Sequence, residues 1–148
     1  MYRGSRDGFG AADFHRCCDG QPRLLVLVRV RDGGELFGGF TAAGFNLPEG
    51  YKTDRTSYLY SLDNALGRPE KLKNKKTGFG MDLLYSPLCS ASFGDGAGLH
   101  ICDNADTATG STTNTGYSYA ESTLTGDHPM KCGTKGGWIA AEVVAWAV

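Results

Sequence analysis

The chain has 148 residues, which suits one domain over residues 1–148, and its net charge is −1. This near-neutral balance argues against nucleic acid or an anionic membrane surface as the main partner. No apolar run reaches the ~18 residues of a membrane-spanning helix. Because Met1–Arg3 lead straight into polar sequence, we also expect no secretion signal.

The cysteines indicate a reducing compartment. There are five, at positions 17, 18, 89, 102 and 132. The count is odd, the one close pair is adjacent, and no C-x-x-C occurs, which argues against both a disulfide framework and a zinc site. We therefore expect a cytoplasmic protein, with any association with an organelle membrane made through a protein partner. We also expect no cofactor.

The first predicted elements are a short helix and a β-hairpin. Apolar spacing predicts a helix over Ala11–Cys18, which Asp19-Gly20 ends. The aliphatic run Leu24–Val30 predicts a central strand, buried on both faces at its start. Arg31–Gly34 has hairpin-turn chemistry. The returning strand Leu36–Thr41 contains a glycine pair, which indicates a bulge or a close approach of another group.

The rest of the chain favours more short strands. We predict a loop over Asn46–Asp54 and strands at Tyr58–Leu62, Met81–Tyr85, Leu99–Cys102 and Trp138–Val148. The connections are mostly of hairpin size, and no internal repeat appears. The predicted fold is mainly β with short helices: an antiparallel two-sheet β-sandwich.

One stretch, Phe93–Tyr119, is dominated by Gly, Ser, Thr, Asn and Asp. Composition alone is typical of a linker, yet apolar residues recur within it. We therefore predict that Leu99, Ile101 and one or both of Tyr117 and Tyr119 are buried, with surface turns between them.

Several segments, in order, resemble the TLDc domain family. They are Tyr2–Phe9, Phe14-His15, Cys18–Gly20, Arg23–Val30, Phe37–Thr41, Ser57–Leu62, Ser92–Gly96, Asp103–Tyr119 and Glu142–Trp146. The chain departs from the family in lacking the usual N-terminal part, in Asp95 within the Phe-Gly-Gly-Gly run, and in Val144, where an acidic residue is common.

The resemblance implies an antiparallel β-sandwich with short helices. It also implies a role in protection from oxidative damage, or in regulating the vacuolar-type proton ATPase through its peripheral subunits. The family has no established catalytic constellation, so the resemblance supplies no catalytic, cofactor-binding or metal-binding residue.

The residues themselves also favour a non-catalytic protein. Of the three histidines, His15 lies on the predicted helix, His100 in a strand and His128 in a loop. His100 and Cys102 would share a strand face about 7 Å apart, which is long for a nucleophile and its base. We therefore favour a partly exposed histidine and a small buried cysteine.

For two further candidate sites, a structural role is favoured over a functional one. Asp103–Gly110 offers oxygen ligands for Ca²⁺, but its spacing fails the EF-hand pattern, and Asp and Asn also stabilise turns. Cys17-Cys18 ends a helix, where the dipole raises a thiol pKa. Cys18 and Cys102 remain the candidate redox thiols.

The segment 68–76 is basic and forms the candidate docking element. Alternatively, its end, Lys73–Lys76, blunts an edge strand near Met81. The candidate partner-contact residues are Arg68, Lys71, Lys73, Lys75, Lys76, Asn104, Asp106 and Asn114. Asp7 is expected to pair with Arg3 or Arg6 and hold the first strand to the helix. The preferred hypothesis is a protein-binding module; the alternatives are a structural module of a ciliary or cytoskeletal assembly and a small thiol-dependent redox enzyme.

Overall fold

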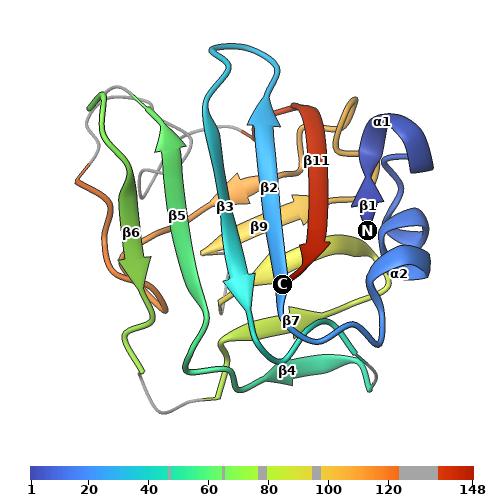
Figure 1. The fold of residues 1–148 in the computed structure, drawn as a ribbon, viewed down its shortest axis with the longest axis horizontal. Coiled ribbons are helices and arrows are strands. Elements are labelled where there is room, and N and C mark those ends of the chain that lie inside the picture. The colour runs from blue at the N-terminus through green and yellow to red at the C-terminus, as the bar shows by residue number, and fades with distance from the viewer. Residues whose placement is uncertain (47, 65, 77–79, 95–97, 124–136) are drawn as a thin grey trace.

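Two antiparallel β-sheets pack face to face, with two short helices at one end of the sandwich (Figure 1). The computed structural model describes residues 1–46, 48–64, 66–76, 80–94, 98–123 and 137–148. The predicted mainly-β sandwich is confirmed.

The larger sheet has six strands in the order β1-β11-β2-β3-β5-β6. These are β1 (Tyr2–Arg3), β11 (Ala140–Ala147), β2 (Leu24–Val30), β3 (Leu36–Thr41), β5 (Tyr58–Asp63) and β6 (Glu70–Lys73). The last strand in sequence lies between the first two, since β11 is hydrogen-bonded to both β1 and β2. The strand β2 is central, as its aliphatic run predicts.

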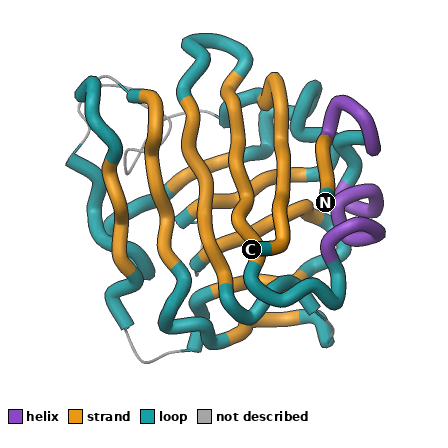
Figure 2. The backbone as a smooth tube through the Cα atoms, viewed as in Figure 1, coloured by secondary structure: helices purple, strands orange, loops and turns teal. Residues whose placement is uncertain are grey.

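The smaller sheet has the order β10-β9-β8-β7-β4. Its strands are β10 (Thr112–Thr113), β9 (Leu99–Cys102), β8 (Cys89–Phe93), β7 (Leu83–Tyr85) and β4 (Gly50–Lys52). In Figure 2 these strands run behind the larger sheet and cross its strand direction at a steep angle. All described pairings in both sheets are antiparallel.

The core lies between the two inner faces. Opposed residues in a ladder share a face, so Val26, Gly39, Leu59 and Leu72 form one inner row of the larger sheet. Gly39 makes room for the ring of Phe93 from the smaller sheet, because a Cβ there would lie 2.7 Å from that ring. Burial of these apolar side chains is the main stabilising term of the sandwich.

Burial along β2 corrects one prediction. Leu24, Val26, Val28 and Val30 are buried, but their neighbours on the other face are only partly buried or exposed. The run of leucine and valine therefore covers the core with one face only. The other face, which carries Leu25 and Leu27, lies at the surface of the molecule.

The helices are α1 (Gly4–Asp7) and α2 (Ala11–Cys18), and α2 has the predicted bounds. The ring of Phe14 on α2 contacts Tyr2 and Phe45 edge to face, at centroid distances of 5.2 and 5.7 Å. Oδ1 of Asp103, on the loop after β9, accepts the backbone N–H of Ala11 at 2.7 Å and so caps α2 from a distant part of the chain. Neither helix is long and apolar enough to cross a membrane, and the described residues contain no other helix.

Other predicted bounds differ from the structure. The predicted loop over Asn46–Asp54 contains β4, and the basic segment contains β6. Strand β8 was not predicted, because its small polar residues give no alternating pattern although all five are buried. Strands β7 and β11 each begin two residues later than predicted.

The stretch Phe93–Tyr119 is ordered as predicted over its described residues. Leu99, Ile101 and Tyr119 have exposed fractions of 0%, whereas Tyr117 is 57% exposed. Asn104 adopts the left-handed region at φ 51°, and its carbonyl accepts the N–H groups of Thr107 and Ala108. The polar residues between the buried anchors thus form turns.

Candidate functional site

The outer face of the larger sheet is the most prominent surface of the molecule. It turns toward the viewer in Figure 1, and no helix lies across it. A groove of about 550 Å³ runs over this face from β6 to β11. We call it the outer groove; its apolar lining consists of Leu25, Leu27, Tyr58, Tyr60, Leu62 and Trp146.

The strand register explains why these side chains meet. Leu27, Gly38, Tyr60 and Lys71 are opposed in one row across four strands, and Gly38 contributes no side chain. Tyr60 extends across this gap, and its hydroxyl donates a 2.6 Å hydrogen bond to the carbonyl of Val26 on β2. Burial raises the pKa of the Tyr60 phenol, so it remains a neutral donor.

Gly38 is required by this arrangement. A Cβ at this position would lie 1.9 Å from the Val26 carbonyl oxygen and 2.8 Å from the Tyr60 hydroxyl. The predicted close approach at the glycine pair is therefore confirmed, while the bulge lies at Leu36/Phe37 instead. The missing side chain leaves room for Tyr60, whose side chain lines the groove.

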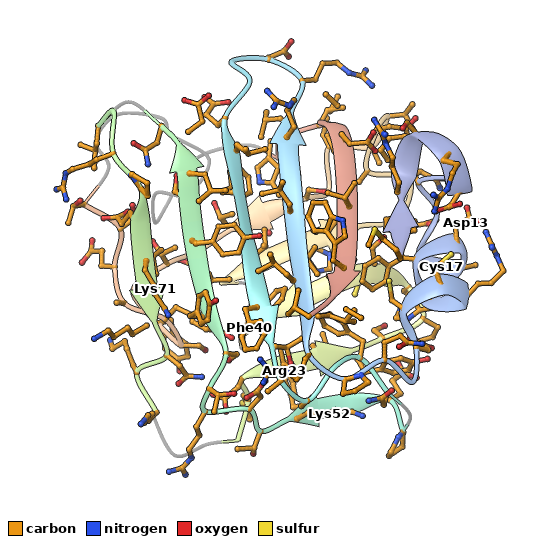
Figure 3. All side chains as sticks on the ribbon, viewed as in Figure 1. Asp13, Cys17, Arg23, Phe40, Lys52 and Lys71 are labelled. Atoms are coloured by element: carbon orange, nitrogen blue, oxygen red, sulfur yellow. The ribbon has the colours of Figure 1, made fainter. Side chains whose placement is uncertain are left out.

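Aromatic rings and cations lie together on this face, from Arg23 just before β2 to Lys71 on β6. The rings of Phe40 and Tyr58 stack at a centroid distance of 5.1 Å. Nζ of Lys71 lies 3.6 Å from the Tyr58 centroid, and the Arg23 guanidinium lies 5.6 Å from that of Phe40. Figure 3 shows the side chains of Lys71 on β6 and Phe40 on β3 on the face turned toward the viewer. Such contacts hold the cations over the rings.

The basic segment is the edge of the larger sheet. Five basic residues of the segment are exposed: Arg68, Lys71, Lys73, Lys75 and Lys76. Among the described residues, β6 pairs as a strand with β5 alone, and on its other side only residues 118–120 bond to the backbone of Lys73 and Lys75. The blunted edge is therefore β6 itself, because the strand near Met81, β7, lies inside the smaller sheet between β8 and β4. This corrects the predicted location of the edge.

A second, smaller hollow of about 200 Å³ adjoins the outer groove. Both are lined by Tyr58 and Lys71, and the smaller hollow adds the cations Arg55, Lys73 and Lys76. Among the described residues, none of these cations forms an ion pair with a carboxylate. An apolar groove thus continues into a basic hollow.

The three other candidate contact residues lie elsewhere. Asn104 and Asp106 belong to the turn after β9, where the carbonyl of Asp106 accepts a hydrogen bond from Arg31. The backbone N–H of Asn114 donates to Gly98 at 3.4 Å. None of the three lines the outer groove or the basic hollow. The structure therefore places these three residues away from both hollows, although the end of the same polar stretch, at Gly116 and Ser118, bonds to Lys75.

The candidate thiols are held in packed or bonded positions. Cys18 is buried, and burial raises its pKa to about 12. Sγ of Cys102 accepts a hydrogen bond from Ser111 at 3.2 Å, and His100 contacts Ser92 at 3.4 Å. The four described cysteines are free thiols. Cys132 and His128 lie outside the described residues.

His15 has a structural environment. Nδ1 lies 2.7 Å from Oδ1 of Asp19, while Nε2 lies 3.0 and 2.9 Å from the carbonyls of Ser86 and Cys89. All of these neighbours are acceptors, so the ring joins α2 to the connection between β7 and β8 as a donor. Its nitrogens are occupied in that role.

The loop tested for Ca²⁺ is also occupied by internal bonds. The carboxylate of Asp103 accepts the N–H of Ala11 at Oδ1 and the amide of Asn104 at Oδ2. Within the described residues, no group of three or more His, Cys, Asp or Glu side chains is arranged to hold a metal ion. At the first helix, Asp7 forms the expected ion pair with Arg6 at 2.7 Å and accepts the backbone N–H of Arg3. Its carboxylate therefore ties β1 to α1, and not to the predicted helix, which is α2.

A buried polar cluster joins the two sheets, and no sequence motif indicated it. We call it the polar clasp: Asp54, Asn74, Asp82, Ser57 and Tyr119. Asn74 donates to Asp82 Oδ1 at 2.8 Å, and the Tyr119 hydroxyl lies 2.7 Å from the Asp82 carbonyl and 2.9 Å from Ser57 Oγ. The polar side chains of the clasp all have hydrogen-bond partners within the chain, so the clasp is a structural network.

Asp54 is the most heavily bonded member of the clasp. Burial opposes its charge, but hydrogen bonds from Thr56, Thr41 and the N–H groups of Ala43 and Ala42 outweigh burial and lower its pKa. A carboxylate held by so many donors stays ionised at neutral pH. It is not available as a general acid.

Comparison with known proteins adds one finding. The family model described as "TLDc domain" matches residues 1–134. None of the curated proteins compared with the chain matches it.

Proposed function

Because the chain belongs to the TLDc domain family, we propose that it acts as a protein-binding module without catalytic chemistry of its own. The observation that carries this proposal is the outer groove, an apolar hollow on an uncovered sheet face beside exposed cations. Contiguous exposed apolar surface of this kind marks interaction sites in soluble proteins.

We propose that the module continues beyond the matched residues, over 1–148. Strand β11 lies at 140–147, after the matched range, yet it pairs with β1 and with seven residues of β2. Without β11 the larger sheet would have an open edge at β2. This pairing supports one domain.

The proposed partner is the peripheral sector of the vacuolar-type proton ATPase, and the proposed process is protection from oxidative damage. Both rest on resemblance to the TLDc family. A cytoplasmic location is proposed with them, and the four free thiols among the described residues support it.

The partner proposal is tested with purified components. The tagged chain is immobilised and incubated with purified peripheral-sector subunits in moderate salt, and we expect the chain to retain them. Heat-unfolded chain on the same resin is the control. If the folded chain retains no subunit, the ATPase is not its partner.

The basic edge has a test of its own. Charge reversal of Lys73, Lys75 and Lys76 to Glu should weaken retention, because opposed charges across an interface govern encounter and specificity. Arg16→Glu, on the exposed side of α2, is the matched control. Unchanged retention by the triple variant would show that the basic segment does not contribute to binding.

A further inference from the structure

The outer face of the larger sheet is hollowed along its whole width. Besides the outer groove, a hollow of about 380 Å³ is lined by Val144 and Trp146, and one of about 170 Å³ by Leu27 and Val144. Trp146 and Leu27 also line the outer groove. The three hollows therefore adjoin one another from β6 to β1. The outer groove is the most apolar of them, because charged side chains join the lining toward β1: Arg3, Arg6, Arg29 and Glu142.

We propose that this face binds an amphipathic helix of a partner protein, with the acidic residues of that helix placed over the β6 edge. The inference rests on the proposed function and deepens it, because it names the surface and the chemistry of the partner.

The geometry of the sheet favours a helix over an extended segment. The strands under the groove already pair with neighbours on both sides, except at the β6 edge, so the face offers no ladder to a further strand. An extended segment lying on apolar side chains would leave its own N–H and C=O groups without partners. A helix satisfies its backbone internally and presents an apolar stripe.

The width of the face sets the length of the helix. From β6 to β11 there are four inter-strand steps in the sheet order, which amount to about 19 Å at ~4.8 Å each. At about 1.5 Å per residue, this width matches a helix of roughly 13 residues. Its apolar residues would recur at i, i+3, i+4 and i+7.

The distribution of charge orients the helix. At the β6 end, Arg55, Lys71 and Lys73 are exposed, and no described carboxylate pairs with them. The carboxylates of this face already accept hydrogen bonds from other residues of the chain. Glu70 accepts bonds from Ser122 and Thr123, and Glu142 from Arg3 and Ser5.

The unmatched charge of this face is therefore positive and is greatest at the β6 end, although Arg29 of β2, which lines the smallest of the three hollows, also has no described carboxylate partner. An acidic group of the partner complements it there, whereas a basic helix meets three like charges. This complementarity selects an acidic partner.

The direct test uses two synthetic helical peptides of about 14 residues, each stapled to hold the helix. Both carry Leu at the spacing above; one has three Glu at one end and the other has three Lys. Binding to the folded full chain is measured by fluorescence anisotropy. The acidic peptide should bind at least ~10-fold more tightly than the basic one. A tenfold change in the dissociation constant requires a difference of only about 1.4 kcal/mol in binding free energy.

Two variants locate the binding. Leu62→Asp places a charge in the groove at a side chain that is 44% exposed, so the fold is retained, and it should weaken binding at least ~10-fold. The double variant Lys71→Glu and Lys73→Glu should reverse the peptide preference. The control Leu88→Asp, at a side chain 79% exposed outside the groove, should bind as the unchanged chain does.

The outcomes separate this inference from the proposed function. Equal binding of the acidic and basic peptides, or equal binding by Leu62→Asp and Leu88→Asp, overturns the inference. If the Leu62→Asp chain still retains the ATPase subunits, the proposed partner stands and the surface is wrong. If the acidic peptide binds as expected but no subunit is retained, the surface stands and that partner is wrong.

Discussion

The backbone N–H of Asp54 donates a 2.8 Å hydrogen bond to Oδ2 of Asp82, so two buried acids meet through a main-chain group. Asp54 lies on the loop that leads into β5 of the larger sheet, and Asp82 immediately precedes β7 of the smaller one. The contact joins the sheets at one end of the sandwich, together with the other hydrogen bonds of the polar clasp.

The polar clasp should make stability depend on pH in the acid range. The pKa of Asp54 is lower in the folded chain, so the unfolded chain binds more protons between the two pKa values. The stabilisation is complete above the unfolded value of about 4 and is lost as the pH falls through the lowered pKa. Urea unfolding of Asp54→Asn should show a shallower acid dependence and a loss of about 1–3 kcal/mol at neutral pH. Asp63→Asn, at an exposed position, is the control, and identical pH profiles for all three proteins would contradict the assignment.

Substitution of Gly38 should be more damaging than substitution of a turn glycine. Gly38→Ala forces a methyl group into the Val26 carbonyl and should cost about 3 kcal/mol in the free energy of unfolding. Gly34→Ala has open space but a φ of 75°, so it should cost only about 1 kcal/mol. Chemical denaturation measures both. Equal losses would mean that the sheet shifts to accommodate the methyl group.

Loss of the His15 ring should loosen α2 from the smaller sheet. His15→Ala leaves the carbonyls of Ser86 and Cys89 without this donor and should cost about 1–3 kcal/mol. Arg16→Ala, beside it but exposed, should change stability by less than about 1 kcal/mol. Thermal unfolding followed by circular dichroism compares the two variants. A melting temperature for His15→Ala equal to that of Arg16→Ala would remove the bridging role.

The buried thiols of Cys18 and Cys89 should react slowly with an alkylating reagent. Because burial raises the pKa of Cys18 to about 12 and that of Cys89 to about 11, few thiolates form at neutral pH. We expect alkylation of both at least ~100-fold slower than a model thiol, with normal rates in urea. Mass spectrometry of the labelled peptides gives each rate. Fast labelling of Cys18 in the folded chain would restore the hypothesis of a redox enzyme.

Local patterns predicted the elements whose signal lies within one segment. The bounds of α2 followed from its apolar spacing and the Asp19-Gly20 stop, and the burial of Leu99 and Ile101 followed from alternation. Strand β6 escaped prediction, because its single buried residue, Leu72, lies among charged side chains. The basic segment was correctly associated with a sheet edge, but the predicted edge was the strand near Met81, whereas the observed edge is β6.

The outer groove depends on relationships that no single segment contains. Leu25 and Leu27 resemble core residues in sequence, and only the position of β2 under an uncovered face distinguishes them from Val26. Tyr60 reaches Val26 only because the register places Gly38 between them. The polar clasp likewise combines residues from distant loops. Such sites follow from strand order, which the sequence pattern leaves open.

The insertion of β11 between β1 and β2 also governs the order of assembly. Tyr2 pairs with Ala145, so β1 is synthesised long before the strand that it pairs with. Until β11 emerges, the aliphatic strand β2 presents an unpaired edge. A contact this distant in sequence is slow to form, and during that interval the unpaired edge of β2 is a template for pairing with another chain.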